Sequence, residues 1–271
     1  MTTPFDGLGL WVFDFLGGGT PLTPADAAAY KAQGVRWFGF KVSDGLTGGG
    51  QAIFTSYSAG VNAGLTALPW GFFEPGIDTA QQLQILYQAS GEGFPAAICD
   101  IESVQTIPSL AGPSAHGMKL GISTWGNPLP TALLDIGHPG APSIGQLADI
   151  GVRAILPQAY GEAWGVTPAR AIQIMQAAYA ACNLPNMPPL LPTSDQGGEA
   201  LAFAQAAKAA GYGGVSFWRH GANGVTPAAL AGVAALFPPP APSPPPPPPS
   251  PVQLVTGQEY LTPKGDTLVL G

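Results

Sequence analysis

The stretch Ala96-Ala97-Ile98-Cys99-Asp100-Ile101-Glu102-Ser103 lies near the middle of the chain and is a short apolar run that ends in two acids. A run of this length and composition predicts a strand that is buried on both faces. Because side chains alternate along a strand, Asp100 and Glu102 would point to the same side. The stretch therefore predicts a buried strand with two carboxylates at its C-terminal end.

Further apolar runs of the same kind are separated by helical segments. The expected strands span residues 8–15, 35–42, 66–73, 96–101, 118–124, 152–158, 189–193 and 214–218. The clearest helices are expected at residues 24–33, 78–90, 168–181, 199–210 and 227–237. Buried strands with intervening helices indicate a parallel sheet, and eight such units in about 237 residues are typical of a closed α/β barrel of the (β/α)8, TIM type. An open doubly wound sheet is the alternative, but the chain has neither a GxGxxG nor a GxxxxGK[ST] motif for nucleotide binding.

Local signals mark where several of these helices begin and end. Thr23-Pro24, Thr167-Pro168 and Thr226-Pro227 each place a capping threonine before a proline that fits the first helical turn. Gly34 and Gly211 follow two of the helices at positions suited to a left-handed C-cap. These signals support the alternation of strands and helices.

The composition changes abruptly after residue 237. Residues 238–251 are mostly proline, which predicts a semi-rigid polyproline II linker between a barrel domain at 1–237 and a segment at 252–271. A ligand for an SH3-like partner is the alternative, although the flanking basic residues of such ligands are missing. Residues 252–271 alternate weakly around a turn and predict a short hairpin-like β segment. A lone hairpin is unstable in water, so we expect this segment to serve attachment or self-association, including attachment to a virion.

Charge and hydropathy exclude several classes of partner. The chain of 271 residues has only nine Lys and Arg and a formal net charge of −7, without a basic cluster. We therefore expect no nucleic-acid partner. No apolar stretch approaches the roughly 20 residues that span a bilayer, and the N-terminus has no basic region typical of a signal peptide. We expect neither a membrane partner nor a readable signal peptide.

The cysteines and histidines do not form a local metal motif. Cys99 and Cys182 lack CxxC or Cys/His spacing, and we interpret both as buried thiols. His116, His138 and His220 lie in separate segments, and we expect a structural or hydrogen-bonding role for each. The sequence predicts no metal site and no cofactor.

Polar residues gather at the predicted C-terminal ends of the strands, where the active site of a (β/α)8 barrel is assembled. Besides Lys41, Ser43, Asp44 and Ser123, the candidate polar site residues are Asp14, Glu74, Asp100, Glu102, Gln158, Tyr160, Asp195 and Arg219. Among the aromatic residues there, Trp218 is a candidate for substrate binding, and Trp125, Tyr160 and Trp164 are candidate platforms for sugar rings, whereas Trp37 and Trp70 are expected in the core. Paired carboxylates suit sugar chemistry, in which one donates a proton and the other stabilises positive charge. An ordinary strand end with polar residues is the alternative.

Several short motifs resemble the family 25 glycoside hydrolases, which are lysozyme-like muramidases of phages and bacteria with a (β/α)-barrel fold. The motifs are Asp14, Phe38-Gly39-Phe40-Lys41-Val42-Ser43-Asp44-Gly45, Asp100-Ile101-Glu102, Gly121-Ile122-Ser123-Thr124-Trp125 and Phe217-Trp218. The stretch Leu156-Pro157-Gln158-Ala159-Tyr160 also resembles related glycoside-hydrolase-like barrels of bacterial and phage proteins. The resemblance covers about residues 8–220 in order.

The resemblance implies roles for individual residues. Glu102 would be the general acid, Asp100 would position or polarise the substrate, Asp14 would line the adjoining subsite and Asp195 would match a further carboxylate. We also expect crowding by Asp100 and Asp14 to raise the pKa of the proton donor, Glu102. Arg219 stands where the family usually has glutamine after a tryptophan. It would either hold an anionic sugar carboxylate or neutralise the catalytic acids.

Two functions of different class follow from these patterns. The first is a glycoside hydrolase that acts on peptidoglycan, muramidase- or endolysin-like, with a polysaccharide as its partner. The second is a non-catalytic carbohydrate-binding protein or a phage virion or tail structural protein that retains the barrel. The expected location is the cytoplasm until lysis, or the virion if the protein is phage-encoded.

Overall fold

The computed structural model describes residues 3–15, 18–48, 53–90, 93–102, 119–128, 152–183, 187–221, 224–238, 259–261 and 267–269. The chain divides into two compact units, Met1–Pro239 and Pro240–Gly271. The first unit carries the barrel. In the second, β12 (Glu259–Leu261) pairs antiparallel with β13 (Thr267–Val269), as a hairpin-like segment requires. The predicted linker from residue 239 onward and the alternating residues 252–255 lie outside the described residues.

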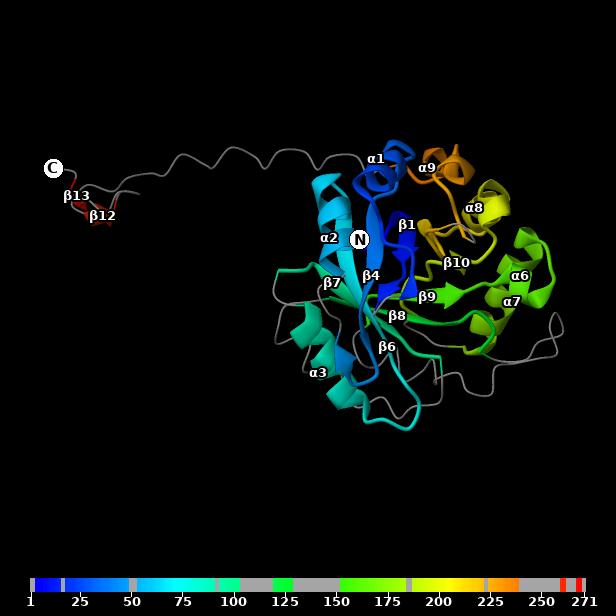
Figure 1. Ribbon diagram of the computed structural model, residues 1–271, viewed down its shortest axis with the longest axis horizontal. Helices are drawn as coiled ribbons and strands as arrows, with labels where there is room; N and C mark the ends of the chain where they lie inside the picture. The colour runs from blue at the N-terminus through cyan, green and yellow to red at the C-terminus, as the bar shows by residue number, and fades with distance from the viewer. Residues whose placement is uncertain are drawn as a thin grey trace. The chain divides into compact units, whose positions relative to one another are not determined.

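The first unit is a closed barrel of eight parallel strands, as predicted (Figure 1). Along the chain the barrel strands are β1 (Gly7–Val12), β4 (Trp37–Asp44), β6 (Thr66–Phe72), β7 (Ala96–Asp100), β8 (Lys119–Trp125), β9 (Ala154–Gln158), β10 (Thr193–Ser194) and β11 (Gly214–Phe217). Neighbours in sequence are neighbours in the sheet, and β1 pairs with both β4 and β11, which closes the barrel. All eight C-terminal strand ends therefore meet at one mouth.

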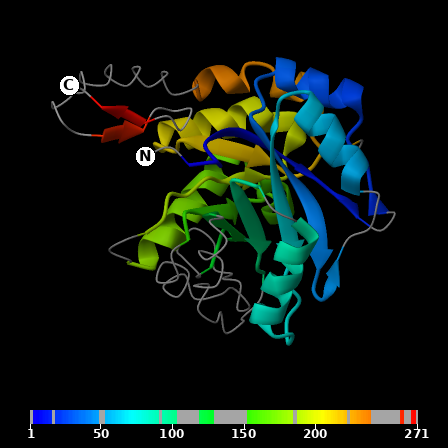
Figure 2. The ribbon, with the colours of Figure 1, turned by 90° about the vertical axis from the view of Figure 1, so that its left-hand side faces the viewer.

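Helices surround the strands on the outside, which Figure 2 shows from blue α1 to yellow α8. The helices described are α1 (Pro24–Ala32), α2 (Ile53–Asn62), α3 (Thr79–Ser90), α6 (Gly161–Trp164), α7 (Pro168–Ala181), α8 (Ala200–Ala209) and α9 (Val233–Leu236), with 3-10 turns η1 (Gly197–Glu199) and η2 (Ala228–Leu230). Short strands extend the mouth: β2 (Asp14–Phe15) pairs with β3 (Gly18–Gly19), and β5 (Thr47–Gly48) pairs with β4. In the described part of the chain, no helix is long and apolar enough to cross a membrane.

The predicted helix signals act as expected at two helix starts. Thr23 Oγ1 accepts a hydrogen bond from Asp26 N at 3.1 Å, and Thr167 Oγ1 accepts one from Arg170 N at 3.4 Å. Gly34 and Gly211 have φ values of +83° and +88°, the left-handed conformation expected of a C-cap. These caps mark both ends of α1, the start of α7 and the end of α8.

The last predicted helix, at residues 227–237, is corrected by the structure. Residues Ala228–Leu230 form a 3-10 turn and only Val233–Leu236 are α-helical. Gly232 separates the two with a φ of +81°, a conformation that ends a right-handed helix. The proline and threonine at the start therefore begin a turn rather than a long helix.

The buried apolar residues form two clusters, one between the strands and the helices and one inside the barrel. Alternate residues of β1 point outward, where Leu8 and Leu10 pack against the helices, while Trp11 points inward. Trp11, Trp37 and Trp70 are at most 2% exposed and fill the interior, with ring centroids of Trp11 6.2 Å from Trp37 and 5.5 Å from Trp70. The prediction that Trp37 and Trp70 belong to the core is confirmed. The interior is a packed core, so the mouth is where a ligand can enter.

Candidate active site

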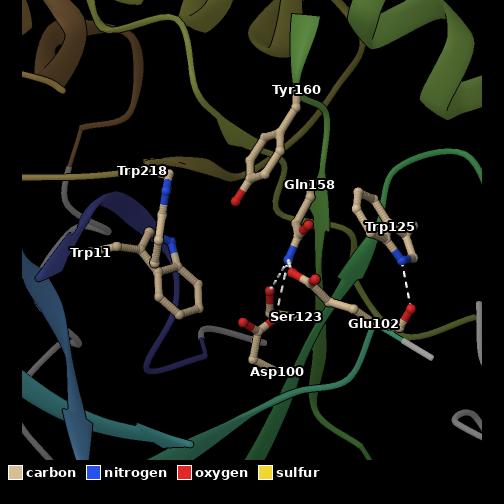
Figure 3. A pocket seen from close by; sticks show the side chains of 8 residues that line it. All are labelled: Trp11, Asp100, Glu102, Ser123, Trp125, Gln158, Tyr160 and Trp218. Carbon is tan, nitrogen blue, oxygen red and sulfur yellow. Dashed lines mark hydrogen bonds between the residues drawn. The ribbon is translucent and has the colours of Figure 1, made fainter. Parts of the chain in front are cut away.

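A pocket of about 180 Å³ opens at the C-terminal mouth of the barrel (Figure 3). Its lining consists of Trp11, Asp100, Glu102, Ser123, Trp125, Gln158, Tyr160 and Trp218. At about 30 Å³ for each water, the volume would hold about six water molecules or one small chemical group. The structure thus brings together seven of the residues predicted at the strand ends: Asp100, Glu102, Ser123, Trp125, Gln158, Tyr160 and Trp218.

Strand register explains why these side chains meet. Asp100 on β7 pairs in register with Ser123 on β8, and Trp125 on β8 pairs with Gln158 on β9. Paired residues of neighbouring parallel strands point to the same side of the sheet. Glu102 follows Asp100 by two residues, and Trp125 Nε1 donates a hydrogen bond to its backbone oxygen at 2.6 Å. The two acids are therefore held at the same side of the mouth.

The side-chain amide of Gln158 joins the two carboxyl groups. Its Nε2 atom lies 2.6 Å from Glu102 Oε1, 3.1 Å from Asp100 Oδ1 and 3.2 Å from Ser123 Oγ. An amide nitrogen has only two hydrogens, so three oxygens compete for them. Among the described residues, Gln158 Oε1 is buried without a hydrogen-bond partner.

Asp100 is the carboxyl group whose pKa the structure raises. Its side chain is only 6% exposed. Burial, and next the charge of Glu102, raise the pKa of Asp100 to about 8, although Ser123, Lys41 and Gln158 oppose the shift. The sequence led us to expect the raised pKa at Glu102, but Asp100 is the deeper of the two acids. The carboxyl pair therefore retains a proton at neutral pH.

Tyr160 directs its hydroxyl group into the pocket (Figure 3). Burial raises the pKa of Tyr160, and the charges of Asp100, Glu102 and Asp195 raise it further, so the phenol remains a hydrogen-bond donor. We expected a flat platform for a sugar ring, whereas the geometry presents the polar tip of the side chain. Trp11 and Trp218 form the apolar wall, with ring centroids 6.2 Å apart.

Three predicted acids lie away from the pocket lining. Asp14 Oδ2 accepts a hydrogen bond from Ser56 Oγ at 2.9 Å, on the side of α2. Glu74 exchanges backbone hydrogen bonds with the Gln82 side chain, of which Gln82 Nε2 to Glu74 O measures 3.0 Å. Asp195 accepts hydrogen bonds from two backbone N–H groups at the start of α6, at 3.2 and 3.1 Å. Roles for these acids in binding or catalysis remain predictions.

Arg219 lies beside the pocket but not in its lining. Its guanidinium carbon is 5.1 Å from the ring centroid of Phe13 and 5.6 Å from that of Trp218. It forms no ion pair with Asp100 or Glu102, both of which the structure describes. The alternative in which Arg219 neutralises these acids therefore has no contact to support it.

Sequence reasoning missed one residue of the pocket wall, Trp11. It is the penultimate residue of β1, and a large aromatic residue within a buried strand is usually core. The alternation of Leu8 and Leu10 with Gly9 and Trp11 is the signal that could have assigned Trp11 to the inward side. Glycine at the inward position before it leaves room for the Trp37 ring, which a Cβ at Gly9 would contact at 2.1 Å.

The described cysteine and histidine side chains are not arranged as a metal site. No group of three or more His, Cys, Asp or Glu side chains there is placed to hold a metal ion. Cys99 is buried, and burial raises its pKa, while Cys182 is only half-buried. His220 hydrogen-bonds with Tyr30 and Pro21, as a structural histidine would. His116 and His138 lie outside the described residues.

The fold and the pocket together define a (β/α)8 barrel with a carboxyl pair at its C-terminal mouth. No protein-family model matches the sequence, and no curated protein matches it. Solved structures do resemble it. The N-acetylneuraminic acid synthetase of Leptospira borgpetersenii has a TM-score of 0.53 at 12% identity, covering 86% of this chain and 82% of that one.

Two further solved structures resemble the barrel. The spore cortex-lytic enzyme SleL of Bacillus megaterium has a TM-score of 0.52 at 8% identity, covering 83% of this chain and 72% of that one. The bacterial lysozyme of Streptomyces coelicolor has a TM-score of 0.40 at 15% identity, covering 57% of this chain and 75% of that one. At these identities the likenesses to the synthetase and to SleL show the barrel fold alone.

Proposed function

We propose that this protein is a glycoside hydrolase that cleaves peptidoglycan, in the manner of a muramidase or endolysin. The observation that carries the proposal is the pair Asp100 and Glu102, bridged by the Gln158 amide in an aromatic-walled pocket at the barrel mouth. Two carboxyl groups in different environments are the equipment that glycosidic bond cleavage needs. The fold shared with a spore cortex-lytic enzyme is compatible with this chemistry.

The two carboxyl groups would have different roles because they are buried to different extents. Glu102 is the less buried of the pair and is the one that reaches a glycosidic oxygen. When the proton of the pair lies on Glu102, it passes to that oxygen as the bond to the sugar carbon breaks. Asp100, then ionised, stabilises the positive charge that develops on the sugar. Water adds to the anomeric carbon and returns a proton to the pair.

The other lining groups would hold the sugar in place. The Tyr160 hydroxyl points into the pocket and donates, so the wall offers a hydrogen-bond donor to sugar hydroxyl or acetamido groups. Trp218 and Trp125 supply apolar surface on two sides of the pocket (Figure 3). We assign to the segment 252–271 an attachment or self-association role outside the reaction.

Digestion of purified cell walls tests the proposal. The wild type should lower the turbidity of the suspension and release reducing ends, whereas Glu102→Gln and Asp100→Asn should lose at least about a hundredfold of this activity. Glu199→Gln is a matched control, because it neutralises an exposed acid on η1 that is not in the pocket lining. Equal activity of wild type and Glu102→Gln would remove Glu102 from the mechanism.

Glycan binding without cleavage is the outcome that favours the second function. If the wild type binds a glycan array or intact cell walls and releases no reducing ends, the barrel serves recognition and the protein is a carbohydrate-binding or virion component. The distinction needs both measurements on the same preparation of the full chain.

A further inference from the structure

The mouth of the barrel carries both acidic and basic side chains. Asp100 ends β7 and Glu102 follows two residues later, whereas Lys41 lies in β4 and Arg219 lies two residues after the end of β11. The Phe13 ring lies between the two cations, with Lys41 Nζ and Arg219 Cζ each 5.1 Å from its centroid. Trp11 and Trp218 line the pocket together with the two acids, and the guanidinium carbon of Arg219 lies 5.6 Å from the ring centroid of Trp218. A ligand that extends from the pocket past Trp218 would therefore come near the guanidinium of Arg219.

Of the two cations, Lys41 has an acidic partner among the described residues and Arg219 does not. Lys41 is buried, and its Nζ forms an ion pair with Asp44 at 2.6 Å. Arg219 is half-buried, and within the described residues its guanidinium has no acidic partner and no side-chain hydrogen bond. Its described contacts are with aromatic rings, which engage the guanidinium carbon and leave its N–H groups to a ligand.

The surroundings also make a compensating cation useful. The chain has a net charge of −7, and the carboxyl pair adds negative charge next to the pocket. A polysaccharide that carries carboxylates would be repelled there unless a cation faces it. An arginine held against two rings is well prepared for this, because little side-chain freedom remains to be lost on binding.

We propose that Arg219 binds a carboxylate group of the glycan substrate beside the pocket that Asp100 and Glu102 line, and so selects acidic over neutral polysaccharides. The proposal rests on the proposed function for the sugar in the pocket. The planar guanidinium fork matches a carboxylate with two parallel hydrogen bonds, which a lysine cannot reproduce. Trp218, which lines the pocket and contacts Arg219, links the two sites.

The test compares two soluble oligosaccharides of equal length in a Glu102→Gln background, which prevents turnover. One is a neutral N-acetylglucosamine oligomer, and the other alternates N-acetylglucosamine with N-acetylmuramic acid whose lactyl carboxylate is free. Affinities are measured by titration calorimetry. Without a change at Arg219, we expect about tenfold tighter binding of the acidic oligomer, as is typical of a charge-assisted hydrogen bond at a partly exposed site.

Arg219 variants in the same background decide the assignment. Arg219→Gln should lose the preference for the acidic oligomer, and Arg219→Lys should keep only part of it, while binding of the neutral oligomer stays unchanged in both. An equal loss for both oligomers would make Arg219 a packing residue and overturn the inference, as would an unchanged preference. Cleavage is measured separately on the wild type: a wild type that binds through Arg219 but cleaves neither oligomer refutes the proposed hydrolase and leaves the carboxylate site standing.

Discussion

Replacing Asp100 by asparagine should make the protein more stable at alkaline pH. The ordinary pKa of this carboxyl group is 3.8, and the folded protein raises it to about 8. Between these values the native state keeps a proton that the unfolded state has lost. The stability of the wild type must therefore fall as the pH rises through this window. Asparagine has nearly the same shape and no charge, so Asp100→Asn lacks this dependence.

The size of the effect follows from the linkage between proton binding and folding. One proton of difference changes the free energy of unfolding by about 1.4 kcal/mol per pH unit. Multiplying this slope by the difference between the two pKa values gives an upper limit. Because the pocket is open to water, we expect a smaller relative stabilisation of about 2 to 3 kcal/mol across the window. In a domain of this size, that free energy corresponds to about 5 to 10 °C in Tm.

Thermal unfolding monitored by circular dichroism gives the answer. Wild type, Asp100→Asn and the control Glu199→Gln are compared from about pH 4.5 to pH 9, which covers most of the window between the two pKa values and extends past its upper end. The Tm of Asp100→Asn relative to the wild type should rise with pH, while Glu199→Gln runs parallel to the wild type. A constant difference between Asp100→Asn and the wild type over this range would refute the raised pKa and the burial behind it.

Three other substitutions test the pocket and the core. Tyr160→Phe removes the hydroxyl donor and should lower kcat on cell walls about tenfold with little change in Tm; a normal kcat would make Tyr160 a wall residue. Gln158→Leu removes the bridge between the carboxyl groups and should lower kcat about a hundredfold, and an active variant would argue against the bridge. Trp37→Ala leaves a cavity in the barrel and should destabilise it by about 3 to 5 kcal/mol in urea unfolding, whereas a loss below about 1 kcal/mol would contradict its core position.

Local chemistry was enough to predict most elements, because their signals lie within a few residues. Thr23 and Thr167 cap helices in the structure as the Thr-Pro pairs predict. The strand expected at 189–193 was harder, since only Thr193–Ser194 form β10 and Leu190 makes an isolated bridge to Ile155. How far a short strand pairs is decided by its neighbours in the barrel rather than by its own residues.

In the site, too, some features follow from the local sequence and others depend on tertiary packing. The period of two along β7 correctly placed Asp100 and Glu102 on one side. Asp14 did not join them, because the chain leaves β1 and turns into the antiparallel pair β2 and β3, which carries Asp14 toward Ser56. Which of the two acids is buried, and so has its pKa raised, depends on packing that no local pattern contains.

Cleavage of cell walls in water enriched in ¹⁸O tests the central claim most directly. Hydrolysis of a glycosidic bond by the Asp100–Glu102 pair places one oxygen from water at the new reducing end, which mass spectrometry detects as a gain of about 2 Da. We predict this label in the products of the wild type and of Glu199→Gln, and its loss with Glu102→Gln. Unlabelled sugar ends, or products that Glu102→Gln forms as fast as the wild type, would contradict the account.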